Sequence, residues 1–134
     1  EGRLRELRQR YSSARTLKVV VEIWHQPLFT VGDTHLLSDA LRVCGARNAL
    51  PNYPLLAGPV PIENVLAADV DIILSVTGVT ETEMQSRWGD RVAMRGARAV
   101  ELISLDPDLL TRASDRMVEG VEMLCRRLDQ VRAD

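Results

Sequence analysis

The sequence predicts an α/β fold, a three-layer αβα lobe with a mostly parallel central sheet. Residues 17–23 and 70–76 are almost continuously apolar and β-branched, which is typical of strands buried on both faces. Amphipathic segments of helical period lie between and after these runs, and alternating strands and helices favour a parallel sheet covered on both faces. With 134 residues and 46% hydrophobic content, the chain can bury the core of one such domain.

The first third of the chain predicts helix, strand, loop and helix. Residues 1–14 carry apolar side chains at helical spacing, and strand 17–23 follows. A loop over 24–32 leads to a helix over 33–44, which Asp33 or Thr34 can cap and Gly45 can end. One side of this helix is expected to carry Leu36, Leu37, Ala40, Leu41 and Cys44.

The remaining elements follow the same logic. Residues 51–61 are rich in proline and predict an irregular loop, after which Pro61 suits the first turn of a short helix. Strand 70–76 is followed by Thr80 and Glu83, whose spacing is that of a capping box for a helix to about Trp88. A strand over 99–105 and a long amphipathic helix from residue 110 complete the chain.

Composition excludes several classes of function. The net charge of −2 gives no reason to expect nucleic acid or an acidic membrane as a partner. No apolar run approaches the roughly 18 residues of a membrane span. The common glycine-rich nucleotide motifs and the G-x-S-x-G motif of hydrolases do not occur, so neither a cofactor nor an enzymatic activity is expected. The sequence begins without a methionine or a signal peptide and is therefore expected to be trimmed.

Three stretches resemble a known family: residues 24–30, residues 43–46 and Asn48. They are similar to the carboxy-terminal lobe of the periplasmic substrate-binding proteins that feed ABC importers, in the branch that carries vitamin B12, haem and ferric siderophores. The resemblance implies that residues 1–16 end an inter-lobe helix, that residues 17–134 form the carboxy-terminal lobe, and that an amino-terminal lobe precedes it. It also implies a periplasmic or extracytoplasmic location, with or without a lipid anchor.

The implied function is to capture a corrinoid, haem or siderophore and to deliver it to an ABC permease in the inner membrane. Six residues would face the ligand: Trp24, His25, Gln26, Pro27, Asp108 and Arg112. Flat apolar rings suit a tetrapyrrole or an aromatic siderophore, and Arg112 could bind a propionate, phosphate or carboxylate. His25 could ligate iron or cobalt, although one histidine without neighbouring ligands does not predict a resident metal site.

The resemblance assigns three further residues. Glu63 matches a glutamate that docks on arginines of the permease, and Cys44 and Cys125 match cysteines that pair in a disulfide. Such a pair indicates an oxidising compartment. Ala57 stands where the vitamin B12 carriers of the family have a cleft tryptophan, which puts cobalamin itself in doubt.

Two other classes of protein remain as alternatives. A metal-cluster or metal-ion-binding α/β domain of related architecture would need clustered ligands, whereas this chain has two distant cysteines and two histidines ten residues apart. A receiver-like signalling domain would need acidic residues gathered at the carboxyl ends of its strands. Glu22, at the end of the first strand, is not followed by that pattern.

Overall fold

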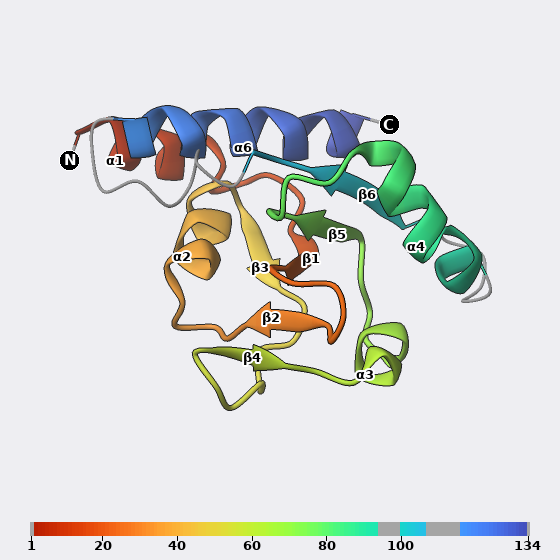
Figure 1. The fold of residues 1–134 in the computed structure, drawn as a ribbon. Coiled ribbons are helices and arrows are strands. Elements are labelled where there is room, and N and C mark those ends of the chain that lie inside the picture. Colours follow the sequence, from red (N-terminus) through yellow and green to blue (C-terminus); the bar gives the residue numbers. More distant parts are fainter. Residues whose placement is uncertain (1, 94–99, 107–115, 134) are drawn as a thin grey trace.

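The computed structural model describes residues 2–93, 100–106 and 116–133, and these form a three-layer αβα arrangement, as predicted (Figure 1). In chain order the elements are α1 (Gly2–Arg10), β1 (Leu17–Glu22), β2 (Phe29–Val31), α2 (Leu36–Val43), β3 (Ala46–Asn48), β4 (Ala57–Pro59), α3 (Ile62–Ala67), β5 (Ile72–Ser75), α4 (Glu81–Ala93), β6 (Glu101–Ser104) and α6 (Arg116–Ala133). No described helix has both the length and the apolar character needed to cross a bilayer.

The central sheet has four parallel strands in the order β3-β1-β5-β6. Val21 of β1 pairs with Leu74 of β5, which pairs with Ile103 of β6, so the apolar runs of the three strands lie in register. Because all four strands run the same way, their carboxyl ends meet at one edge of the sheet, where α/β proteins hold their ligands.

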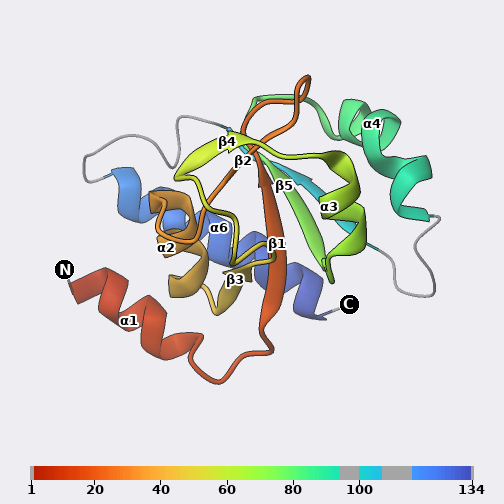
Figure 2. The ribbon, with the colours of Figure 1, turned by 90° about the horizontal axis from the view of Figure 1, so that it is seen from below.

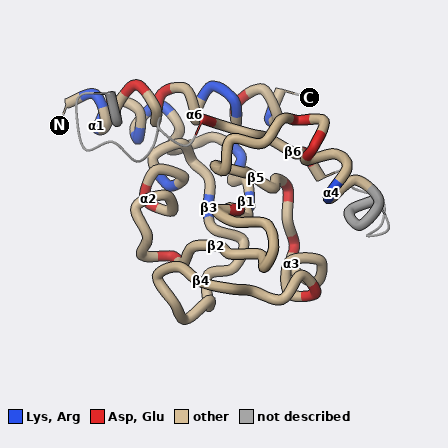
Figure 3. The backbone as a smooth tube through the Cα atoms, in the orientation of Figure 1, with Lys and Arg blue, Asp and Glu red and all other residues tan. Residues whose placement is uncertain are grey.

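Each face of the sheet carries its own apolar core. The view turned by 90° shows helices on both sides of the sheet (Figure 2). We call the two faces the α6 face, covered by α1, α2 and α6, and the α4 face, covered by α3 and α4. The small antiparallel ribbon of β2 and β4 contributes Val31 to the core of the α6 face. Alternate residues of β1 divide between the two faces, with Val19 and Val21 on the α6 face and Val20 on the α4 face. Both acidic and basic residues occur along α1 and α6 (Figure 3).

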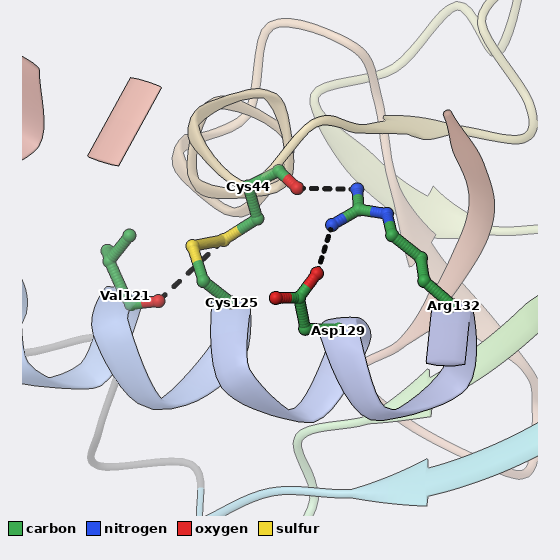
Figure 4. Close-up of a disulfide and its surroundings, with 5 residues drawn as sticks. All are labelled: Cys44, Val121, Cys125, Asp129 and Arg132. Carbon is green, nitrogen blue, oxygen red and sulfur yellow. Dashed lines mark hydrogen bonds and ion pairs between the residues drawn. A yellow bond between two sulfur atoms is a disulfide. The ribbon is translucent and has the colours of Figure 1, made fainter. Parts of the chain in front are cut away.

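A disulfide between Cys44 and Cys125 joins α2 to α6, as the resemblance implies (Figure 4). Beside it, the guanidinium of Arg132 donates to the carbonyl of Cys44 at 2.6 Å and to that of Arg15 at 2.7 Å. Gly45 ends α2 with a φ of 75°, and an added Cβ would lie 2.9 Å from the Arg132 guanidinium. Only glycine meets both conditions easily, so the predicted end of α2 is confirmed.

The beginning of α2 differs from the prediction. His35 is its N-cap, and its Nδ1 accepts the backbone N–H of Leu37 at 3.0 Å. The predicted cap Asp33 instead pairs with Arg42 at 3.1 Å. Since the helix begins three residues later than predicted, Leu36 lies near its start and is 45% exposed, contrary to the apolar side proposed for it.

Other helix and strand boundaries also differ from the prediction. The capping box before α4 is confirmed, with the Glu83 backbone N–H donating to the Thr80 hydroxyl at 3.0 Å and the Thr80 backbone N–H donating to the Glu83 carboxylate at 3.3 Å. The helix it begins runs to Ala93, beyond the predicted end. Three short strands, β2, β3 and β4, were not predicted, and β4 lies within the stretch expected to be irregular.

Candidate functional site

The carboxyl edge of the sheet ends in a row of polar side chains. Glu22 of β1 is paired in register with Ser75 of β5, and Ser75 with Ser104 of β6. The three alternate in phase with Val20 and therefore point to the α4 face. The apolar core thus gives way to hydrogen-bonding groups at the level where the loops begin.

The loop after β1 is held by backbone hydrogen bonds. Ile23 N–H donates to the Phe29 carbonyl and Phe29 N–H to the Trp24 carbonyl, both at 3.0 Å. The Thr30 hydroxyl donates to the Val21 carbonyl at 2.6 Å, which fixes β2 against β1. These hydrogen bonds fix the backbone of the loop, but the Trp24 side chain is 59% exposed, so its ring is available as an apolar surface.

A pocket of about 370 Å³ opens beside this loop. Its lining residues are Trp24, His25, Gln26, Thr77, Val79 and Arg87. The structure therefore brings together three of the four ligand-facing residues expected in the loop, whereas Pro27 is exposed and does not line the pocket. Such a volume takes a side group of a large chelate rather than the whole molecule.

Glu22 lies beneath the pocket and is the residue that the sequence reasoning missed. Its side chain is fully buried, with one carboxylate oxygen accepting the indole N–H of Trp88 at 2.8 Å. The other carboxylate oxygen accepts from Arg87 at 3.4 Å, and His25 Nδ1 is 3.5 Å from the first. The only sequence signal was a glutamate near the end of an apolar run, because its partners lie some 65 residues away.

The remaining expected site residues lie elsewhere. Asp108 and Arg112 fall outside the described residues, so their placement stays a prediction. Glu63 is exposed in the first turn of α3, on the same side of the sheet as α4. Ala57 is exposed on β4, next to Leu56, which is 60% exposed.

A larger hollow of about 660 Å³ lies between α1, α2 and α6. Its lining is mainly aliphatic, and two of its charged residues, Arg42 and Asp39, form an ion pair with each other. Because polar groups do not converge there, the smaller pocket at the carboxyl edge is the better candidate for a binding site. Within the described part of the chain, no three His, Cys, Asp or Glu side chains are grouped to hold a metal ion.

The chain is similar in sequence to known binding proteins, although no family profile matches it. It is 27% identical over 128 residues to a vitamin B12-binding protein of Photorhabdus laumondii, a match that covers 95% of this chain and 44% of that protein. It is 29% identical over 115 residues to an ABC transporter substrate-binding lipoprotein of Bacillus subtilis, covering 82% of this chain and 35% of the other. The chain therefore spans less than half the length of these relatives.

Solved structures of similar fold include proteins of the same class. A periplasmic haem-binding protein of Pseudomonas aeruginosa superimposes with a TM-score of 0.74 and 22% identity, over 94% of this chain and 49% of that one. These relatives are named as binding proteins, in agreement with the expectation of a non-enzymatic chain. In sequence and in fold, the chain resembles one lobe of the periplasmic substrate-binding proteins of ABC importers, so the family resemblance predicted from its residues is confirmed.

Proposed function

We propose that the chain is one lobe of the substrate-binding component of an ABC importer, which captures a corrinoid, haem or ferric siderophore. The observation that carries the proposal is the exposed Trp24 ring beside a pocket at the carboxyl edge of the sheet. Apolar planar surface with a few converging polar groups is what a flat chelate with polar substituents requires. The relatives named for vitamin B12 and haem support this class of ligand without choosing within it.

The second wall of the cleft would come from an amino-terminal lobe, which is proposed to precede this chain. Residues 1–16 would then end the helix that joins the two lobes. A location outside the cytoplasm, with or without a lipid anchor, is supported by the periplasmic and lipoprotein names of the relatives and by the disulfide.

Delivery of the ligand would use Glu63. The glutamate is exposed at the beginning of α3, and its side chain is therefore available to an arginine of a permease. We assign ligand capture to the carboxyl edge, with Asp108 and Arg112 as further proposed contacts, and permease docking to α3.

Optical titration of the full-length protein with haemin, cobalamin and a ferric siderophore tests the proposal. We expect saturable binding of one of the three, weakened at least tenfold by Trp24→Ala and unchanged by Leu36→Ala, which removes an exposed aliphatic side chain on the α6 face. Absence of binding to all three chelates would contradict the proposed function.

The alternative, a metal-cluster or metal-ion-binding domain, receives less support. Both cysteines are consumed in the disulfide and cannot act as thiolate ligands while it is intact. The buried carboxylate of Glu22 is hydrogen-bonded to an indole and a guanidinium, which are donors and not metal ligands.

A further inference from the structure

His25 has a buried nitrogen without a hydrogen-bond partner. Its Nδ1 is inaccessible to solvent, and Oε1 of Glu22 lies 3.5 Å from it. The side chain as a whole is nevertheless 28% exposed and lines the pocket at the carboxyl edge. Nδ1 contributes nothing to that exposure, which therefore comes from the other atoms of the side chain.

Glu22 is held rigidly enough to orient the imidazole. The carboxylate is fully buried and is fixed by Trp88 on one oxygen and Arg87 on the other. An ionised carboxylate only accepts hydrogen bonds, so the histidine nitrogen that faces it is favoured as N–H. The 3.5 Å separation is longer than an ordinary hydrogen bond, so a bond between the two groups requires the imidazole to move toward the carboxylate.

We propose that Glu22 holds His25 as its Nδ1–H tautomer, so that the lone pair of Nε2 faces the pocket and ligates the metal of the captured chelate. The inference rests on the proposed function and narrows the class of ligand that this function assigns to the pocket. A carboxylate that accepts from one nitrogen of a metal-bound histidine is the usual arrangement in proteins, because it sets the tautomer and makes the other nitrogen more basic. Glu22 is in this sense a positioning residue and His25 the ligand.

The arrangement selects among chelates. An axial imidazole can bind only a metal with an exchangeable coordination position, which a tetrapyrrole or corrinoid offers on the face of its ring. A hexadentate ferric siderophore fills every position of its iron with its own oxygen atoms. Trp24, adjacent in the chain and 59% exposed, adds a flat apolar surface that suits a macrocycle. We therefore infer a macrocyclic chelate with an open axial position as the ligand class.

The first experiment determines the tautomer. In full-length protein labelled with ¹⁵N-histidine and carrying His35→Asn, NMR reports the protonation of His25 without overlap from the other histidine of this lobe. We expect the Nδ1–H form, and a population shift toward Nε2–H in Glu22→Gln. In that variant only one terminal atom of the side chain is an acceptor, whereas Trp88 and Arg87 both remain donors. A predominant Nε2–H form in the protein with intact Glu22 would overturn the proposal.

The second experiment uses haemin and aquocobinamide as probes, with a ferric tris-catecholate as the coordinatively saturated comparison. We expect ¹⁵N hyperfine coupling from His25 to haem iron. It should be lost in His25→Ala and replaced by coupling from added ¹⁵N-labelled imidazole. Glu22→Gln is expected to weaken binding of the coordinated probe about 10- to 100-fold, as loss of an outer carboxylate usually does.

Asp71→Asn is the matched control. Asp71 is also a buried carboxylate, but it lies at the amino end of β5, where it accepts the backbone N–H of Lys18 at 2.9 Å. We expect its effect on probe affinity to stay below twofold. If haemin or aquocobinamide binds equally well with and without His25, or only the tris-catecholate binds, the ligation is wrong and the proposed function stands. If none of the three binds, both fail.

Discussion

The two faces of the sheet are stabilised in different ways. The α6 face has the larger apolar core, a disulfide and the Arg132 guanidinium that binds two backbone carbonyls. The α4 face has the smaller core and includes the buried charge of Glu22, held by Trp88 and Arg87. A buried ion pair contributes little net stability compared with apolar packing, but it fixes the side chains involved. The main stabilising contacts and the proposed ligand site thus lie on opposite faces of the same strands.

The largest effect is expected from removing the disulfide on the α6 face. Cys44 and Cys125 are separated by 81 positions, and the loop-closure entropy of such a cross-link corresponds to about 4 kcal/mol. The Cys44→Ala/Cys125→Ala variant should lose that much free energy of unfolding in urea denaturation. Reducing agent should destabilise the wild type similarly and leave the variant unchanged. A loss below about 1 kcal/mol would show that packing on this face suffices by itself.

On the α4 face, Trp88→Phe should have the next largest effect. The substitution keeps most of the buried ring but removes the N–H that donates to Glu22 at 2.8 Å. Hydrogen bonds to charged groups contribute about 1.5–3 kcal/mol, so we expect a loss of that order in the free energy of unfolding. In the Glu22→Gln background the loss should be smaller, because the acceptor is no longer charged. Equal losses in both backgrounds would show that the contribution of Trp88 to stability does not depend on the charge of Glu22.

A smaller, pH-dependent effect is expected at His35. Burial lowers the pKa of His35 below 6.5, and Asp39 opposes this shift. The neutral ring, whose Nδ1 caps α2, is therefore favoured by folding, and its contribution is complete above pH 6.5. As pH falls below 6.5 toward the lowered pKa, we expect a loss of about 1 kcal/mol, the usual contribution of a cap. His35→Asn keeps a cap at every pH, so unfolding measured at pH 8 and pH 5 should show a smaller loss for the variant.

The smallest effect on stability is expected at Glu63, on the outer surface of α3. Glu63→Arg should change the free energy of unfolding by less than about 0.5 kcal/mol, because the side chain is exposed. Ligand affinity should also be unchanged, while stimulation of the permease ATPase should fall, since the reversed charge faces arginines. Glu101→Arg, an exposed glutamate on β6, is the control. If Glu63→Arg stimulates the permease ATPase normally, Glu63 is an ordinary surface carboxylate without a role in docking.

Long elements could be predicted from the sequence because their signals are local. Strands β1 and β5 are mainly apolar, and the Thr80–Glu83 capping box lies within four residues. The strands that were missed, β2, β3 and β4, have three residues each, too few to establish a period. They form by pairing with distant segments, such as Thr30 with Gly58.

The same reasoning applies to the site. The loop residues Trp24 and His25 could be placed from the sequence because they follow a strand that was correctly predicted. The burial of Glu22 could not, because it depends on α4, which brings Trp88 to the end of β1. The local sequence around a glutamate beside an apolar run does not show whether its side chain is solvated or buried.

The row of Glu22, Ser75 and Ser104 links the chemistry of the pocket to the pairing of the strands. Inserting one residue within β1 would turn Glu22 to the α6 face, because side chains alternate along a strand. Variation within the strands is therefore restricted to substitution. Insertions and deletions are tolerated in the loops beyond this row, which lie on the surface. New ligand preferences can arise there by changes in loop length, while the buried carboxylate that orients His25 stays in place.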